Sequence, residues 1–227
     1  MASRERVAVF VSAALLAGCG GAPSGNGVAA RTPAQIVAAA KAAAMGAASV
    51  HVAGSIVSEG KPISLNMELV AEKGGKGRVA LDGLSFRLVD VDHAVYVSGS
   101  TAFYARFAGA TAARVLRGKW LKGAEAGALA SLASLAHLHS LLNNTLAGHG
   151  ALSRGPSASV DGQQAVGVSD TAIGGTLYVA GTGAPYPLEI VKRGAGAGKI
   201  VFDQWNQPVS LSVPANAINI NQLQSGR

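Results

Sequence analysis

The spacing of apolar residues indicates a helix near the start of the chain. Between residues 33 and 48 they recur every three or four positions, at Ile36, Val37, Ala40, Ala44 and Met45, which predicts one amphipathic helix. The preceding Thr32-Pro33-Ala34-Gln35 favours a helix start here. Threonine can cap a helix, proline fits the first helical position, and glutamine three residues after the cap completes a capping box.

The period changes from 3.6 to 2 at Ser49. Apolar and polar residues then alternate in the stretches 49–52, 63–72, 78–82, 85–92 and 94–98, and Gly74-Gly75-Lys76-Gly77 predicts a turn between two of them. Alternating strands joined by short turns are typical of an antiparallel meander with one buried face.

The middle of the chain has a different pattern. Residues 101–117 are mixed and predict either a helix or a loop, and residues 119–122 predict a short strand or a turn. Residues 125–146 carry leucines at helical spacing, which predicts one or two helices covering the sheet. Serine, histidine and asparagine side chains make this stretch too polar for a transmembrane span.

Strand patterns return at 164–169, 176–180, 187–192, 199–204 and 208–213, with turns at 161–162, 181–183, 194–198 and 206–207. The sum predicts an α+β fold in which one long antiparallel sheet is interrupted by helices. A sheet of this length must curl, and its concave face needs covering. We expect a single domain over residues 33–227.

The first nineteen residues indicate export and lipidation. Arg4 and Arg6 precede ten uncharged residues, a run shorter than the roughly 20 that span a bilayer. Leu16-Ala17-Gly18-Cys19 resembles the bacterial lipobox. That resemblance implies a signal peptide over 1–18, a diacylglyceryl group on Cys19 and a flexible tether over 19–32. The expected location is the outer face of the cytoplasmic membrane; the alternative is a plain secretory signal with a chance cysteine.

Composition excludes some classes of protein. Cys19 is the only cysteine, so no disulfide can form within the chain. The net charge is +7, but lysines and arginines are spread singly, and a nucleic-acid partner is not expected. A solvated surface, or one resting near anionic lipid head groups, explains the charge better.

The sequence shows no catalytic constellation. Ser169 lies outside any G-x-S-x-G pattern, and the glycine run at 194–198 is a hairpin turn rather than a phosphate-binding loop. His137 and His139 are two residues apart and would point to different sides of a helix. No cluster of His, Asp and Glu is evident along the chain. We therefore expect no enzyme activity, no cofactor and no metal site.

A domain of this kind without catalytic residues favours binding. An apolar ligand is the simplest partner for an apolar concave face. The same residues could also close a dry core without any cavity. The alternative function is then an envelope interaction or accessory protein, acting through its surface and without a ligand, with a transporter as one possible partner.

Eight short motifs together resemble the LppX/LprG-type lipoproteins of mycobacteria and related actinobacteria. They are Ser49-Val-His-Val-Ala-Gly54, Gly77-Arg-Val-Ala-Leu-Asp-Gly83, Val91-Asp-His-Ala-Val-Tyr-Val97, Lys119-Trp-Leu-Lys122, Val160-Asp-Gly-Gln163, Gly175-Thr-Leu-Tyr-Val179, Pro185-Tyr-Pro-Leu-Glu-Ile190 and Phe202-Asp-Gln-Trp-Asn-Gln-Pro-Val209. The resemblance implies a half-barrel related to the lipoprotein carriers of the Lol system, with helices against its concave side. It also implies a non-catalytic role, in which acyl chains of a lipid or glycolipid are held between sheet and helices and carried or presented.

The family has no motif that assigns pocket residues, so the candidates follow from the alternating pattern. On the sheet we expect Leu65, Met67 and Leu69 to face the ligand. On the helical cover the candidates are Leu132, Leu135 and Leu142.

Overall fold

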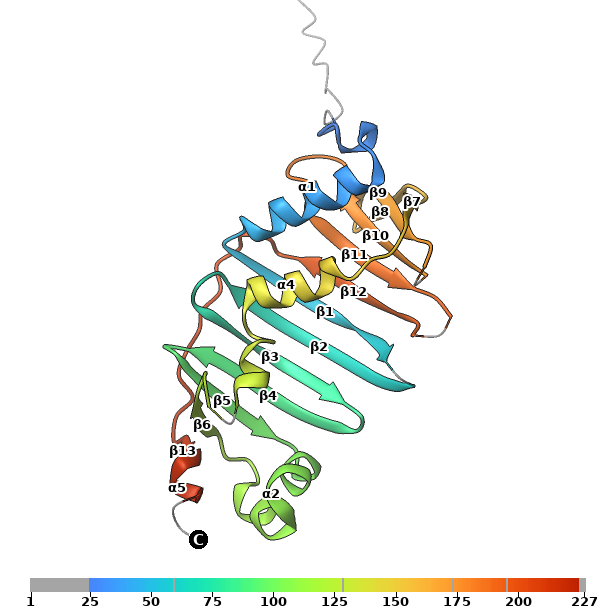
Figure 1. Cartoon of the computed structure of the whole chain (residues 1–227). Helices are drawn as coiled ribbons and strands as arrows, with labels where there is room; N and C mark the ends of the chain where they lie inside the picture. Colours follow the sequence, from blue (N-terminus) through green and yellow to red (C-terminus); the bar gives the residue numbers. More distant parts are fainter. Residues whose placement is uncertain (1–24, 59, 128, 173, 195, 225–227) are drawn as a thin grey trace, which may run out of the picture.

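Thirteen strands form one sheet in the part of the chain that the structure describes. This computed structural model describes residues 25–224 apart from 59, 128, 173 and 195 (Figure 1). The predicted signal peptide at 1–18 and Cys19 lie outside the described residues. The strands are β1 Ser49–Ser58, β2 Lys61–Val70, β3 Gly74–Leu81, β4 Leu84–Val91, β5 Ala94–Gly99, β6 Leu121–Ala124, β7 Leu152–Arg154, β8 Ala158–Val160, β9 Gln163–Asp170, β10 Gly175–Ala180, β11 Pro187–Lys192, β12 Gly198–Asp203 and β13 Ile218–Asn219.

Two meanders join edge to edge to make this sheet. The strand order is β13-β6-β5-β4-β3-β2-β1-β12-β11-β10-β9-β7, and β8 also pairs with β9. β1 and β12 connect the two halves, with His51 opposite Asp203 in an antiparallel register. Of the described pairs, only β13 with β6 is parallel. The sheet does not close into a barrel, which confirms the predicted α+β half-barrel.

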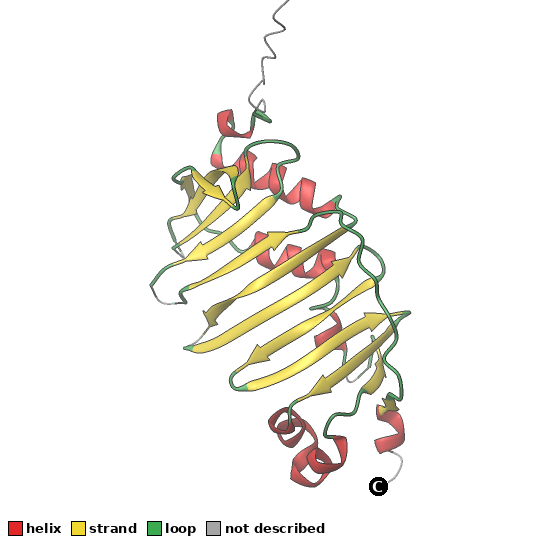
Figure 2. Cartoon of the chain, turned by 180° about the vertical axis from the view of Figure 1, so that it is seen from behind, coloured by secondary structure: helices red, strands yellow, loops and turns green. Residues whose placement is uncertain are grey.

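The helices gather on one face of the sheet. They are the 3₁₀ turn η1 Val28–Ala30, α1 Pro33–Met45, α2 Thr101–Leu116, α3 Ala130–Ala133, α4 Leu138–Ala147 and α5 Ile220–Gln224. α1, α3 and α4 cross the concave face, and α2 lies at one end beside β4 and β5 (Figure 1). The opposite face carries no described helix (Figure 2). The helices thus cover one face of the sheet, as predicted.

Local signals determined several element boundaries. The predicted capping box at the start of α1 is confirmed, because Gln35 N donates to Thr32 Oγ1 (3.3 Å) and Thr32 N donates to Gln35 Oε1 (3.0 Å). Residues 101–117 are largely helical, but Gly109, with φ 86°, divides α2 into two parts. The leucine-rich stretch 125–146 contains two short helices, α3 and α4.

The predicted tether over 19–32 is too long. Residues 19–24 lie outside the described part, but Asn26 donates through its side chain to the carbonyl of Ala180 at 2.9 Å. Val28 is only 1% exposed and packs with apolar residues of α1, β9 and β10. The packed part of the chain therefore begins before residue 33, because Val28 gains apolar burial in a gap beside α1.

The prediction of a strand over 208–213 is wrong. This segment runs past the ends of the strands without joining a ladder (Figure 2). β12 is already paired with β1 on one side and β11 on the other, so no sheet edge is free where the segment begins.

The predicted turn at 74–77 is also wrong, because these residues form the first half of β3. A Cβ on Gly75 would lie 2.8 Å from the carbonyl oxygen of Ala136. The glycine therefore allows the segment between α3 and α4 to approach the sheet closely.

Candidate functional site

An apolar groove lies between the sheet and its helical cover. Its volume is about 260 Å³. All twelve lining residues are apolar: Ile63, Leu65, Met67, Val79, Leu81, Leu84, Phe86, Phe103, Phe107, Leu132, Leu135 and Leu141. The inward-facing positions of β2, β3 and β4 supply one wall, since alternate residues of a strand point to the same face.

Four of the six predicted pocket residues lie in this groove. Leu65 and Met67 line it from β2, and Leu132 and Leu135 from the helical cover. The other two, Leu69 and Leu142, are fully buried in the main core and do not line the groove.

Two aromatic residues of α2 complete the groove and were not among the predicted residues. Phe103 and Phe107 are four residues apart, so they lie on one side of a helix. The Phe103 ring centroid lies 5.1 Å from that of Phe86 and 4.8 Å from that of Phe107. Phe107 is 69% exposed. The three rings form a path from the buried wall to solvent, so α2 provides the groove with an aromatic rim.

α2 is held at its first turn by a buried tyrosine. The hydroxyl of Tyr104 donates to the carbonyl of Lys119 (2.8 Å) and accepts from the backbone N–H of Gly99 (3.0 Å). Tyr104 is 1% exposed. The first turn of α2 is therefore fixed to the sheet, whereas the exposed Phe107 lies closer to the break at Gly109.

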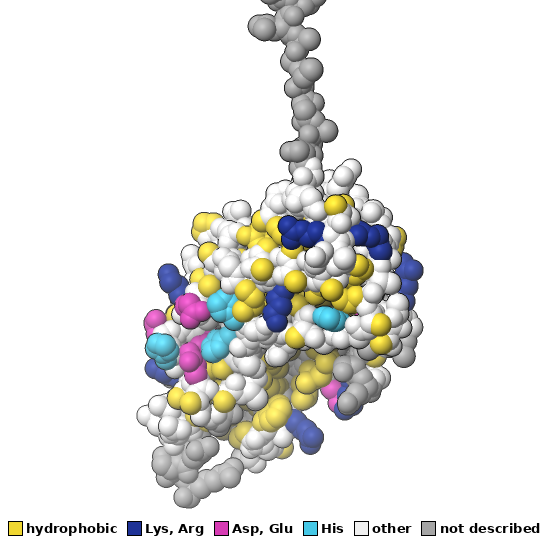
Figure 3. Space-filling model, turned by 45° about the horizontal axis from the view of Figure 1, so that its top comes forward, with side chains coloured by type: hydrophobic (Ala, Val, Ile, Leu, Met, Phe, Trp, Pro, Cys, Tyr) yellow, Lys and Arg dark blue, Asp and Glu magenta, His cyan; other side chains and the backbone are white. Residues whose placement is uncertain are grey.

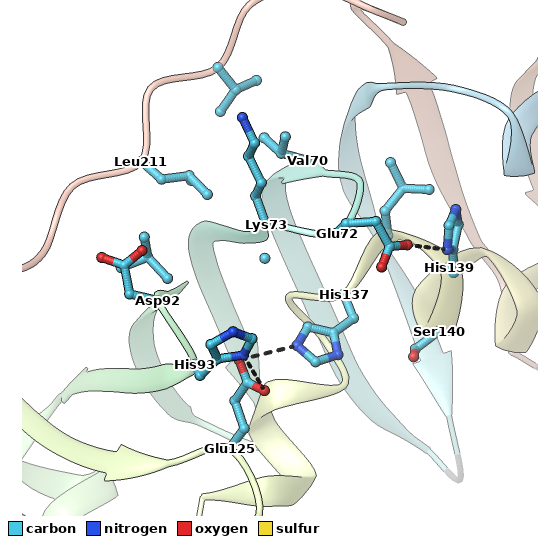
Figure 4. A pocket seen from close by; sticks show the side chains of 14 residues that line it. Val70, Glu72, Lys73, Asp92, His93, Glu125, His137, His139, Ser140 and Leu211 are labelled. Atoms are coloured by element: carbon cyan, nitrogen blue, oxygen red, sulfur yellow. Dashed lines mark ion pairs between the residues drawn. The ribbon is translucent and has the colours of Figure 1, made fainter.

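A second, polar cavity of about 780 Å³ lies beside the start of α4 (Figure 4). Its charged and titratable lining residues are Glu72, Lys73, Asp92, His93, Glu125, His137 and His139. Figure 3 shows histidine and acidic side chains gathered at one side of the helical face. His139 Nδ1 lies 3.2 Å from Glu72 Oε1, and His93 Nδ1 lies 3.8 Å from Glu125 Oε2.

Asp90 lies buried next to His137, which lines this polar cavity. Its side chain is 1% exposed, and Oδ2 lies 2.9 Å from His137 Nε2. Neither carboxylate oxygen accepts a hydrogen bond within the described part of the chain. Burial and then the negative charge of Glu125 raise the pKa of Asp90 from 3.8 to about 6, although neighbouring His137 opposes the rise.

This cluster was not predicted from the sequence. Asp90, Glu125 and His137 each offer one ligand atom, and these atoms all lie within 4.8 Å of one another. They come from β4, the residue after β6 and the residue before α4, so their spacing along the chain gives no sign of their proximity. One available signal was the pattern of β4, where Asp90 follows Phe86 and Leu88 at the inward positions.

The raised pKa predicts how stability depends on pH. The pKa of Asp90 is higher in the folded than in the unfolded chain, so the native state holds this proton more tightly. That stabilisation is present below about pH 4 and is lost as pH rises through about 6. We expect Asp90→Asn to stabilise the protein at pH 8 by about 1–3 kcal/mol, measured in a chelator so that no metal ion neutralises the carboxylate. At pH 4, where Asp90 is protonated in the folded chain, the substitution should have little effect. Urea unfolding at both pH values measures this, and an equal gain at both would rule out the raised pKa as the cause.

Comparison with known proteins shows a shared fold. No family model matches the chain, and no curated protein matches it in sequence. The crystal structure of LprF from Mycobacterium bovis matches with a TM-score of 0.57 at 15% identity, covering 81% of this chain and 97% of LprF. That of the Mycobacterium tuberculosis lipoprotein LppX matches with a TM-score of 0.50 at 18% identity, covering 79% and 98%. The resemblance to LppX/LprG-type lipoproteins is thereby confirmed at the level of the fold.

Among the helices that the structure describes, none combines the length and the apolar character needed to cross a membrane.

Proposed function

We propose that this chain, with the fold of LprF and LppX, is a non-catalytic lipoprotein that binds an acyl chain of a lipid or glycolipid. It would carry or present that lipid in a bacterial cell envelope. The observation that carries the proposal is the groove between sheet and helices, whose lining residues are all apolar. The shared fold with two mycobacterial lipoproteins supports it.

Transfer of an acyl chain into such a groove needs no reaction. Each methylene moved from water into an apolar site gains about 0.8 kcal/mol. Ten methylenes would therefore gain about 8 kcal/mol before the chain loses its conformational freedom. A groove of 260 Å³ is slightly smaller than most ligand pockets, which measure about 300–1,000 Å³. The groove as it stands therefore suits part of one acyl chain, with the head group outside.

α2 is the element best suited to admit a ligand. Gly109 interrupts the helix, while Tyr104 fixes its first turn. Movement of the part around Phe107 would widen the rim without disturbing the sheet. We propose that a lipid enters and leaves at this end of the groove.

Binding can be measured with a fluorescent fatty acid added to a soluble form that begins at residue 20. We expect saturable binding of one probe per chain, and displacement of the probe by unlabelled fatty acid. Failure to bind in the presence of a correctly folded domain would refute the acyl-binding proposal.

The proposed anchor is Cys19, which lies outside the described residues. We expect Cys19→Ala to move the protein from the membrane fraction to the soluble fraction, because the acyl groups on the cysteine would be lost. Fractionation of cells that express the full chain measures this, with Ser24→Ala as the control. Retention of the Cys19→Ala variant in membranes would show that another part of the chain holds it there.

Exposed apolar residues on α2 favour a second candidate function. Phe107 is 69% and Val115 70% exposed. A ligand-free envelope protein could use them to contact a partner such as a transporter. In that case, mutation of Phe107 and Val115 would weaken binding of the partner in cells, although the groove never contained lipid.

A further inference from the structure

Three side chains that commonly bind metal ions converge at the polar cavity. They are the carboxylates of Asp90 and Glu125 and the imidazole of His137. Figure 4 shows Glu125 paired with both His93 and His137. His137 Nε2 lies 2.9 Å from Asp90 Oδ2 and 4.0 Å from Glu125 Oε1. Ligand atoms that share one zinc ion at bond lengths of about 2.0–2.2 Å lie about 3–4 Å apart. The two separations from His137 are therefore close to those of a metal site, and all three ligand atoms lie within 4.8 Å of one another.

The burial of Asp90 distinguishes this cluster from an ordinary group of surface charges. Its side chain is 1% exposed, lies on the inward face of β4 and contacts His137, which lines the cavity. No well-aligned hydrogen bond from the described residues reaches either of its oxygens, and a buried carboxylate held only by a half-exposed histidine is costly. Its nearest ionic contact, His137, is one of the other two ligands. A bound cation would satisfy Asp90 and offset the repulsion between Asp90 and Glu125.

We propose that Asp90, Glu125 and His137 form a binding site for one zinc ion. One imidazole and two carboxylates suit Zn²⁺, which takes nitrogen and oxygen ligands in a tetrahedral arrangement. Ca²⁺ instead prefers six to eight oxygen ligands. Glu125 is 29% and His137 39% exposed, so an ion can reach them from the polar cavity.

The site would connect three separate parts of the fold. Asp90 belongs to β4, Glu125 directly follows β6, and His137 immediately precedes α4. Leu132 and Leu135, in the segment that leads to His137, line the apolar groove. Zinc would thus cross-link this part of the helical cover to the sheet. The site itself does not depend on the acyl-binding proposal, and its test uses no lipid.

The first test is zinc binding by the purified full chain in detergent, after removal of metals with a chelator. We expect one Zn²⁺ per chain by equilibrium dialysis and elemental analysis, together with a higher Tm on addition of Zn²⁺. Added Ca²⁺ should leave the Tm unchanged. Absence of zinc binding, or an equal shift with Ca²⁺, would overturn the proposal.

Variants separate this site from adventitious binding to surface histidines. His137→Gln and Glu125→Gln should each weaken zinc binding at least about tenfold. Mutation of a residue that only hydrogen-bonds to a metal ligand already costs about 10–100-fold in metal affinity, and loss of the ligand itself should cost no less. His139→Gln is the matched control, because His139 lines the same cavity and pairs with Glu72, outside the cluster. It should leave the affinity unchanged. Equal losses in all three variants, or none in His137→Gln, would refute the assignment.

Discussion

Leu135→Trp is expected to weaken binding of a fluorescent fatty acid, with Kd raised at least about tenfold. Leu135 is partly buried and faces the apolar groove from the helical cover. An indole there would occupy much of a 260 Å³ space that an acyl chain needs. A tenfold change in Kd corresponds to about 1.4 kcal/mol, less than the contribution of two buried methylenes. Titration of the soluble domain with the probe measures the effect.

The control for this substitution is Val115→Trp on α2. Val115 is 70% exposed and does not line the groove, so the same added ring should leave probe binding and Tm unchanged. Leu135→Trp should itself retain a Tm close to that of the parent, because the groove accommodates the ring. Normal probe binding by folded Leu135→Trp would show that the acyl chain lies elsewhere.

Leu142→Ala is expected to reduce the free energy of unfolding by about 2–5 kcal/mol. Leu142 is fully buried in the main core on α4, and its truncation would leave a cavity that the surrounding residues fill only partly. Because its side chain does not line the groove, probe binding below the Tm should be nearly normal. Urea unfolding together with probe titration separates these two effects. Lost probe binding with unchanged stability would instead place Leu142 in the ligand pocket, as its helical spacing predicted.

Local signals allowed much of the fold to be predicted. The capping box of Thr32 and Gln35 involves residues three apart, and the alternation in β2 follows from the geometry of a single strand. Such features need no knowledge of distant parts of the chain. The inward positions of Leu65 and Met67 were predictable for the same reason, since they share the face of a period-2 pattern.

The errors arose where position depends on the rest of the fold. Residues 208–213 alternate like a strand, but β12 has no free edge for them. Leu69 and Leu142 follow the same patterns as the groove residues, yet they lie where sheet and helices meet without a gap. Whether an apolar residue faces a core or a cavity depends on the opposing element, and periodicity does not report that element.

The polar cluster was missed for a related reason. Glu125 and His137 are twelve residues apart, and Asp90 lies on another strand. The turn that follows β6 and the close approach of Ala136 over Gly75 bring them together. Asp90 at an inward position of β4 was the one local sign that an unusual group would be buried there.

The most direct test of acyl binding is native mass spectrometry of the soluble domain after expression in an actinobacterial host, with extraction of any bound lipid. We expect one acylated lipid per chain in the parent protein and much less in Leu135→Trp. A ligand-free mass for the folded parent, with no lipid recovered and no uptake of added fatty acid, would contradict acyl binding and favour action through the exposed residues of α2.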